Sequence, residues 1–260
     1  MIDATKFHWL NNAAGAVSLT YDDAFPCHFE TAAPTLEAAG LRGTFNVIVG
    51  RAIFRDHIDE WKQVAARGHE LGNHTVFHPC RSELPIPRPL HDPGYNLCDY
   101  TERRFRDEIE LANWVLTQAD GRRERTYANT CHHNALGRGD AQKSLEPILR
   151  DYFVAARGER TDRGMDIARV NFQNLGTCGA DKRTFAELRD EIENTIAAGN
   201  WIIYTIHGVG EGTFRGFIDL EEHRRLIEWL GANRARVWTA PMIEVANYLR
   251  KFEEIKNLPG

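Results

Sequence analysis

The sequence predicts an α/β fold, a distorted (β/α) barrel of about seven parallel strands within a single domain that spans residues 1–260. Short apolar segments alternate with amphipathic segments from one end of the chain to the other, which is the pattern of repeated strand–helix units. The composition does not shift along the chain. It is 42% hydrophobic and 27% charged, as in ordinary globular domains. These observations favour one barrel over two unrelated domains.

The expected elements follow from hydrophobic periodicity and from glycines placed where helices should end. The predicted strands are 16–20, 43–49, 69–73, 125–129, 151–155, 201–206 and 235–239. The predicted helices are 28–39, 58–67, 101–119, 140–150, 184–198, 220–231 and 241–252. Two segments do not fit the repeat, the proline-rich segment 79–100 and the Gly-, Arg- and Asp-rich segment 156–183. We expect both to form loops at the rim of the barrel.

Ionisable residues follow several predicted strands. Asp22 and Asp23 end the first strand, His74 and His78 follow the third, and His207 follows the most apolar one. Because the carboxyl ends of parallel barrel strands meet at one face, we expect these side chains to converge there. One carboxylate and two imidazoles four residues apart, on one face of a helical turn, would be three ligands of a catalytic metal. The second carboxylate suits a general base, and a histidine in a cleft suits a proton donor.

These residues also have structural interpretations. Adjacent aspartates after a strand are often helix N-caps, and a histidine at a strand end is often a hydrogen-bonded structural residue. His69-Glu70 does not form an HExxH motif, because the next histidine falls five residues on. In Cys131-His132-His133, neighbouring side chains on an extended chain point to opposite faces, which disfavours a Cys–His nucleophile. We expect structural or substrate-rim roles for this segment.

As a set, three motifs resemble those of the polysaccharide deacetylases of the NodB-homology type, carbohydrate esterase family 4. Thr20-Tyr21-Asp22-Asp23 is similar to the T-F/Y-D-D motif, and the run from Gly68 to His78 is similar to G-H-E-I-G-N-H-T/S-x-x-H. Ile203 to His207 resembles the last motif, an apolar strand that ends in histidine. The resemblance covers roughly residues 14–250 and implies the family's distorted (β/α) barrel.

The resemblance also implies roles for individual residues. Asp23, His74 and His78 would be ligands of a divalent metal, usually zinc. Asp22 would be the general base that acts on metal-activated water, and His207 would be the general acid that protonates the leaving amine. An aspartate with two histidines also accommodates iron, cobalt or nickel.

Two family motifs lack a clear counterpart in this sequence. The third normally supplies a proline and an arginine that orients the base, and the corresponding segment 126–133 has neither. A backbone N–H near Cys131 could still serve the oxyanion. The fourth, an Asp-Trp pair that packs against the acid histidine, has its best counterpart in 166–172. These departures predict either a divergent enzyme with a different acyl substrate or an altered activity.

The sequence therefore predicts a metal-dependent hydrolase that removes N-acetyl or other acyl groups from amino sugars or short glycans. One alternative is a hydrolase of a non-sugar amide or cyclic ureide on the same barrel. Another is a non-catalytic barrel that binds metal or glycan, suggested by the two incomplete motifs.

Charge, hydropathy and cysteine usage limit the partners and the location. A formal net charge of −5 argues against a nucleic-acid binder, and no stretch reaches the roughly 18 apolar residues of a membrane span. Residues 1–12 lack the apolar core of a signal peptide. The five cysteines show no framework spacing, which predicts reduced thiols and a cytoplasmic location. The sequence leaves a homo-oligomer open.

Overall fold

A closed parallel barrel forms the centre of the structure, a computed structural model that describes residues 7–82 and 94–255. Its strands pair in the ring order β1-β2-β3-β4-β7-β8-β9, and β9 pairs back with β1. The ring strands are β1 (Gly15–Asp22), β2 (Thr44–Val47), β3 (Glu70–Asn73), β4 (Tyr127–Ala128), β7 (Ala156–Arg160), β8 (Leu175–Gly179) and β9 (Trp201–Ile206). The predicted α/β barrel is confirmed by this ring.

Strand β1 is where the barrel closes. Its first residues pair with β12 (Val237–Thr239), which lies outside the ring, and its last residues pair with β2. Strand β9 runs along its other edge from Ala16 to Tyr21. Every residue of β1 is buried, so the segment has a nearly continuous apolar run instead of an alternating pattern. The carboxyl end of β1 at Asp22 is therefore held between β2 and β9.

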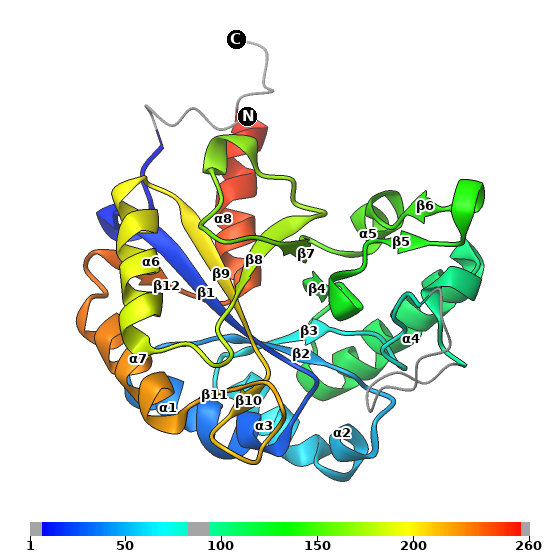
Figure 1. The fold of residues 1–260 in the computed structure, drawn as a ribbon, viewed down its shortest axis with the longest axis horizontal. Helices are drawn as coiled ribbons and strands as arrows, with labels where there is room; N and C mark the ends of the chain where they lie inside the picture. The colour runs from blue at the N-terminus through cyan, green and yellow to red at the C-terminus, as the bar shows by residue number, and fades with distance from the viewer. Residues whose placement is uncertain (1–6, 83–93, 256–260) are drawn as a thin grey trace.

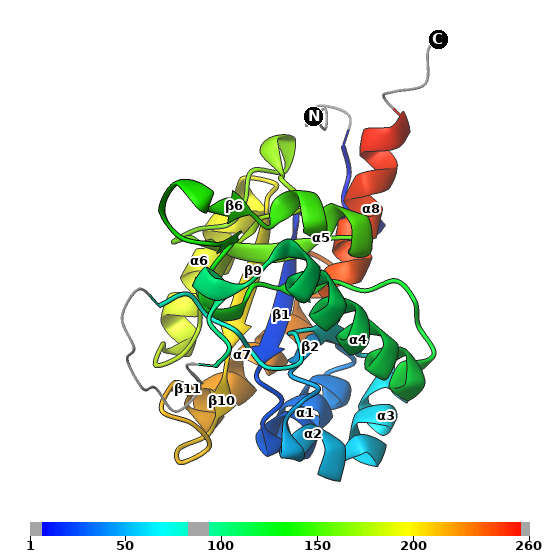
Figure 2. The ribbon, with the colours of Figure 1, turned by 90° about the vertical axis from the view of Figure 1, so that its right-hand side faces the viewer.

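Helices cover the outside of the ring (Figures 1 and 2). They are α1 (Ala33–Ala38), α2 (Ala52–Asp56), α3 (Ile58–Ala66), α4 (Glu102–Asp120), α5 (Glu146–Tyr152), α6 (Phe185–Ala197), α7 (Leu220–Ala232) and α8 (Met242–Ile255). Figure 1 shows α1, α6 and α7 along one side of the barrel and α4 along the other. No helix within the described ranges is both long enough and apolar enough to cross a membrane.

Capping residues explain where the two best-predicted helices begin and end. Thr101 accepts a hydrogen bond from the Arg104 N–H at the start of α4, and Gly121 ends the helix at φ 70°. Thr184 and Glu187 form a capping box at the start of α6. These local signals agree with the apolar spacing, which is why both helices were predicted nearly to their observed ends.

Glu70 is a buried carboxylate that connects four parts of the fold. Its Oε1 accepts hydrogen bonds from the N–H and the hydroxyl of Thr126, at 3.0 and 2.7 Å, before β4. Its Oε2 accepts from the Thr44 hydroxyl of β2 at 2.7 Å and from the Ile243 N–H at 3.1 Å. A negative charge at the N-terminus of α8 is also favoured by the helix dipole. The glutamate that follows His69 is therefore a structural residue of the barrel.

The main errors of the sequence prediction lie in the second half of the ring. Segment 151–155 is not a strand, because α5 continues to Tyr152 and β7 begins only at Ala156. The predicted rim loop 156–183 contains two ring strands, β7 and β8. Strand β8 reads Leu-Gly-Thr-Cys-Gly, and its glycines hide the strand signal. The predicted strand 235–239 exists as β12 but does not belong to the ring.

Smaller differences concern two helices and one loop. The predicted helix 28–39 begins with a π-helical turn, His28–Ala32, and the predicted helix 140–150 begins only at Glu146. Residues 83–93, half of the proline-rich segment 79–100, lie outside the described residues. In the part that is described, Cys80 and Asn96 pair in an isolated parallel β-bridge.

Candidate active site

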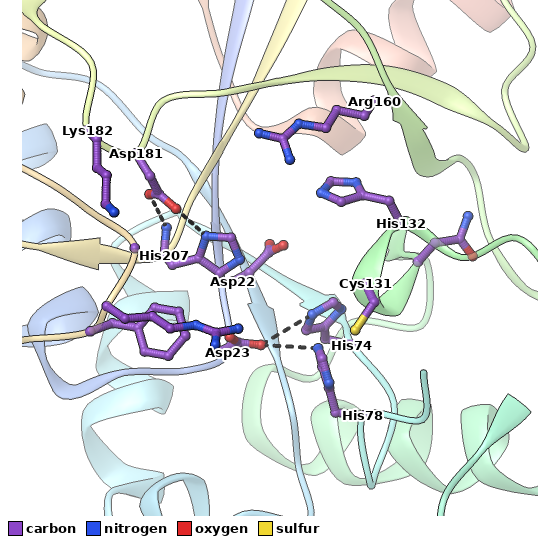
Figure 3. A pocket seen from close by; sticks show the side chains of 14 residues that line it. Asp22, Asp23, His74, His78, Cys131, His132, Arg160, Asp181, Lys182 and His207 are labelled. Atoms are coloured by element: carbon purple, nitrogen blue, oxygen red, sulfur yellow. Dashed lines mark hydrogen bonds and ion pairs between the residues drawn. The ribbon is translucent and has the colours of Figure 1, made fainter. Parts of the chain in front are cut away.

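A pocket of about 490 Å³ opens at the carboxyl ends of the barrel strands (Figure 3). The residues that line it come from the ends of β1 and β7 and from segments that follow β3, β4, β8 and β9. All five side chains that the sequence selected for chemistry line this pocket: Asp22, Asp23, His74, His78 and His207. The predicted convergence of these residues on one face is therefore what the structure has.

Asp23, His74 and His78 form a compact, buried group. The Oδ1 atom of Asp23 lies 3.5 Å from Nε2 of His74 and 3.3 Å from Nε2 of His78. One potential ligand atom from each residue lies within 4.8 Å of the others. Oδ1 is buried and accepts no hydrogen bond from any residue in the described ranges. These three side chains are thus arranged around a common point (Figure 3).

The protonation of this group distinguishes an ion pair from a metal site. Burial lowers the pKa of His78 to about 3, although the Asp23 carboxylate opposes the shift. Burial also disfavours the ionised form of Asp23, but the neighbouring imidazoles outweigh this effect and hold its pKa below the usual value. A neutral His78 imidazole contributes no charge to offset the buried Asp23 carboxylate. The donor set of one carboxylate and two imidazoles therefore fits a divalent cation.

Hydrogen bonds orient the two imidazoles. Nδ1 of His74 lies 2.9 Å from the Ala128 carbonyl oxygen, and Nδ1 of His78 lies 3.6 Å from the Cys80 sulfur. Each Nδ1 can donate to its partner, which leaves the lone pair of each Nε2 directed toward Asp23. The hydrogen-bond acceptor at each Nδ1 therefore favours the tautomer in which Nε2 is free to bind a metal.

The segment from His74 to His78 is not the helical turn that the sequence predicted. Thr75 and His78 adopt left-handed backbone conformations with φ of 67° and 55°, and no helix spans the segment. The buried carboxylate of Glu108 accepts hydrogen bonds from the N–H groups of Val76 and Phe77. The Thr75 hydroxyl accepts another from the His78 N–H at 2.8 Å. Side chains, and not helical hydrogen bonds, hold the two histidines together.

Asp22 is held as an ionised carboxylate. Its Oδ1 accepts hydrogen bonds from Asn46 Nδ2 at 2.8 Å and from Nη2 of Arg157. Burial by itself would raise the pKa of Asp22, but the guanidinium of Arg157, with smaller contributions from His74 and His207, holds it well below the usual value. Both bonds go to the same oxygen atom, so Oδ2 is not engaged by any described residue.

His207 is held by a carboxylate at the end of the neighbouring strand. Its Nδ1 lies 2.6 Å from Oδ2 of Asp181, and its backbone N–H donates to Oδ1 of the same residue at 3.1 Å. Burial disfavours the imidazolium, but the hydrogen bond with Asp181 and the nearby carboxylates raise the pKa of His207 to about 8. His28 donates from Nε2 to the His207 carbonyl oxygen at 2.7 Å. Because its pKa is raised, the His207 imidazole is mostly protonated at neutral pH.

Arg157 and Asp181 are functional candidates that the sequence reasoning missed. The segment 166–172 was expected to hold the partner of the acid histidine, and this was wrong. Asp166 instead caps a short helix by accepting from the Ala168 N–H. Asp181 carries the same signal as the predicted residues, a carboxylate after a buried strand, but β8 had not been recognised. Arg157 lies within β7, and no motif distinguishes it from the other arginines.

Cys80 and Cys131 form a disulfide across 51 residues, which contradicts the expectation of reduced thiols. Cys27, Cys98 and Cys178 lie outside the disulfide and are buried. The bond attaches the start of the proline-rich segment to the pocket wall, because Cys131 is one of the lining residues. The cytoplasmic location stays a prediction.

The histidines after Cys131 have rim and structural positions. His132 lines the pocket, and Nδ1 of its ring lies 3.2 Å from the Gly158 carbonyl oxygen. Burial, and then the charge of Arg157, lowers the pKa of His132 to about 4, so the ring is neutral. His133 accepts a hydrogen bond from the Arg81 N–H at 2.8 Å.

Comparisons with known proteins agree with this fold. The sequence model of a family described as polysaccharide deacetylase matches residues 10–131. A curated relative, a gellan lyase from a Bacillus species, is 30% identical over 156 residues, or 60% of this chain. The chain spans only about 5% of that protein's length.

Solved structures extend the likeness to the whole fold. A Mycobacterium smegmatis protein with a provisional polysaccharide deacetylase name superposes with a TM-score of 0.65 at 15% identity, covering 95% of this chain and 94% of that one. The peptidoglycan deacetylase PdaC from Bacillus subtilis gives 0.55 at 14% identity, over 95% and 98%. A family 4 acetyl xylan esterase from Clostridium thermocellum, solved with cobalt, gives 0.51 at 16% identity, over 94% and 93%.

The site residues Asp22, Asp23, His74 and His78 all lie within the segment that the family model matches, whereas His207 and Asp181 lie beyond it. The superpositions on the solved structures show a shared fold, and the low identities show a large sequence distance. Residues 10–131 thus resemble the polysaccharide deacetylase family, and the chain as a whole shares the fold of these solved structures.

Proposed function

We propose that the protein is a metal-dependent hydrolase that removes acetyl or other acyl groups from amino sugars or short glycans. The observation that carries the proposal is the buried oxygen of Asp23 facing the imidazoles of His74 and His78, beside an ionised carboxylate and a protonated histidine. The pocket thus combines a candidate cation site, a general base and a general acid, and metal-dependent amide hydrolysis uses all three.

Asp23, His74 and His78 would hold the metal, and zinc is the metal that this ligand set most often binds. Iron, cobalt and nickel share the same ligands. When bound, a divalent metal lowers the pKa of water and polarises the acyl carbonyl. The rest of the chemistry belongs to the side chains around it.

Asp22 would accept a proton through Oδ2, because Asn46 and Arg157 occupy Oδ1. His207 would donate a proton from Nε2 to the leaving nitrogen, because Asp181 holds the opposite ring nitrogen. Expulsion of an amine without a proton is slow, so an acid with a pKa of about 8 is well matched to neutral pH. Phe214 adds an apolar wall at the same pocket, with its ring centre 5.7 Å from that of His207.

The two incomplete sequence motifs were the reason to consider a barrel without activity. Arg157 and Asp181 supply an arginine on the base and a carboxylate on the acid, from positions that the motifs do not cover. This supports the enzyme over the non-catalytic alternative. A hydrolase of non-sugar amides or cyclic ureides would use the same residues, so the substrate is what an assay must decide.

The test is acetate release from N-acetylglucosamine oligomers by protein reconstituted with zinc, cobalt, nickel or iron(II). Acetate that appears only with metal, and not with His74→Ala, supports the proposal. His57 is a histidine outside the pocket, and His57→Ala is the matched control that should retain activity. Bound metal without acetate from any oligomer would overturn the amino-sugar proposal, and small amides and ureides would then be assayed.

A further inference from the structure

Three cationic side chains line the pocket without taking part in the proposed chemistry. They are Arg160, Lys182 and Arg215. Within residues 7–82 and 94–255, none of them forms an ion pair or a side-chain hydrogen bond with a carboxylate. Their charges are therefore available to a ligand in the pocket.

Two of the three carboxylates that line the same pocket are paired with cations, Asp22 with Arg157 and Asp181 with His207. The third, Asp23, faces the two imidazoles of the candidate metal site and is outnumbered by the three cations. The unbalanced charge of the pocket is thus positive, although the formal net charge of the whole chain is −5. A local field opposite in sign to the net charge of a protein indicates the charge of the ligand that it attracts.

Arg160 is shared by two cavities, the candidate catalytic pocket and a neighbouring one. It is the last residue of β7, and its Nη2 lies 3.0 Å from where a Cβ at Gly179 would be, so the side chain reaches the end of β8. Arg160 also lines a second cavity of about 530 Å³, formed by residues 160–165. Figure 3 shows its guanidinium on the side of Asp22 away from Asp23 and His78. A group bound by Arg160 would therefore lie on that side of the candidate base.

Lys182 is held in a conformation that lysine does not favour. Its φ is 61°, in the left-handed region, and its N–H donates to the Phe217 carbonyl oxygen at 2.8 Å. A residue with a Cβ is disfavoured in the left-handed region relative to glycine. Strained positions of this kind cluster at functional sites. Arg215 lies on the opposing loop, with its guanidinium carbon 5.6 Å from the centre of the Phe214 ring.

We propose that Arg160, Lys182 and Arg215 bind an anionic group, a carboxylate or a sulfate, carried by the glycan on the reacting sugar or on its neighbour. This inference rests on the proposed function, because it names the class of glycan that the hydrolase would select. Guanidinium groups suit planar carboxylates and tetrahedral oxyanions through paired hydrogen bonds, and an ammonium adds a point charge. The ligand class is thus an acylated, acidic glycan.

The test is equilibrium binding to the metal-loaded protein, measured by calorimetry, with oligosaccharides that carry no acyl group and so cannot turn over. Three matched probes are used: a uronic-acid oligomer, its carboxyl-reduced neutral form, and a sulfated form of that neutral oligomer. We expect an acidic probe to bind about tenfold more tightly than the neutral one, with the difference shrinking as salt rises. A comparison of the affinities of the two acidic probes shows whether the site prefers a carboxylate or a sulfate.

The triple variant R160A/K182A/R215A should lose this preference. Arg103 is an exposed cation on α4 outside the pocket, and Arg103→Ala should retain the preference. If the triple variant does not fold, Lys182→Gly is the second variant, because glycine removes the left-handed strain. Its melting temperature should not fall, while its preference for the acidic probe should weaken.

Two outcomes would overturn the inference. The first is equal binding of the neutral and acidic probes by the wild type. The second is a preference for the acidic probe that survives in the triple variant, because the anionic group would then bind the metal instead of the three cations. Acetate release from a neutral and from an acidic N-acetyl oligomer tests the hydrolase separately. A protein that releases no acetate but still prefers the acidic probe would contradict the proposed function and leave the anion site in place.

Discussion

Arg157 on β7 donates a hydrogen bond to the carboxylate of Asp22 on β1, across 135 positions of the chain. Both side chains are buried, and the pair joins two strands that are not neighbours in the ring. The guanidinium keeps Asp22 ionised and occupies one of its two oxygens. The orientation of the candidate base is therefore set from the far side of the barrel.

Replacing Arg157 by leucine should damage both stability and activity. A buried carboxylate left without its partner costs about 3 to 5 kcal/mol of stability, and the pKa of Asp22 should rise. The acid limb of the pH–activity profile should then move to higher pH. Arg125 forms a similarly buried pair with Asp120, outside the pocket, so Arg125→Leu is the matched control. An acid limb that moves equally in both variants would contradict the role of Arg157.

Replacing Asp181 by asparagine should move the alkaline limb. The carboxylate raises the pKa of His207 to about 8, so activity that needs the imidazolium is present below this pH and lost above it. Removing the negative charge lowers that pKa, and the limb should move down by about one unit or more. Asp190 is an exposed carboxylate on α6, and Asp190→Asn should leave the profile unchanged. Profiles of kcat against pH for the three proteins provide the measurement.

Zinc should stabilise the protein by binding only the folded state. At a free concentration about 100 times the Kd, the gain is about 2.7 kcal/mol, or roughly 5 to 10 °C in Tm for a chain of this size. His78→Ala should lose this shift, and His57→Ala should retain it. A shift that survives in His78→Ala, measured by calorimetry with and without chelator, would place the bound zinc elsewhere.

Buried neutral histidines should make the fold sensitive to mild acid. Burial lowers the pKa values of His28 and His223 to about 4, against 6.5 for an unperturbed side chain. The unfolded chain therefore takes up protons first, and the free energy of unfolding should fall as the pH drops from about 6.5 to about 4. Each histidine contributes a slope of up to about 1.4 kcal/mol per pH unit. Denaturant titrations of the wild type and of His223→Gln, which should show a shallower slope, test this.

The disulfide predicts a specific thiol count. The denatured chain should show three reactive thiols without reductant and five after reduction, because only Cys80 and Cys131 are joined. Removing the cross-link by Cys131→Ser should destabilise the fold by up to about 4 kcal/mol for a loop of 51 residues. Five thiols in protein purified without reductant would restore the original expectation of reduced cysteines and support the cytoplasmic location.

Local sequence signals were sufficient for much of this protein. Hydrophobic periodicity and helix-ending glycines identified α4 and α6, and apolar runs identified the two longest strands, β1 and β9. Chemistry-bearing residues directly after those strands, Asp22, Asp23 and His207, could be selected because parallel strands end at one face. His74 and His78 were found by the same argument, although their backbone is not the predicted helical turn.

The tertiary structure decided what depends on distant parts of the chain. Strand β8 has little apolar signal of its own and exists because β7 and β9 pair with it, and Asp181 follows from that pairing. Arg157 lacks any motif, and its role arises only when the ring closes and brings β7 opposite β1. The disulfide and the cationic lining of the pocket have the same origin. Periodicity reports the faces of single elements, whereas these contacts are set by which elements become neighbours on folding.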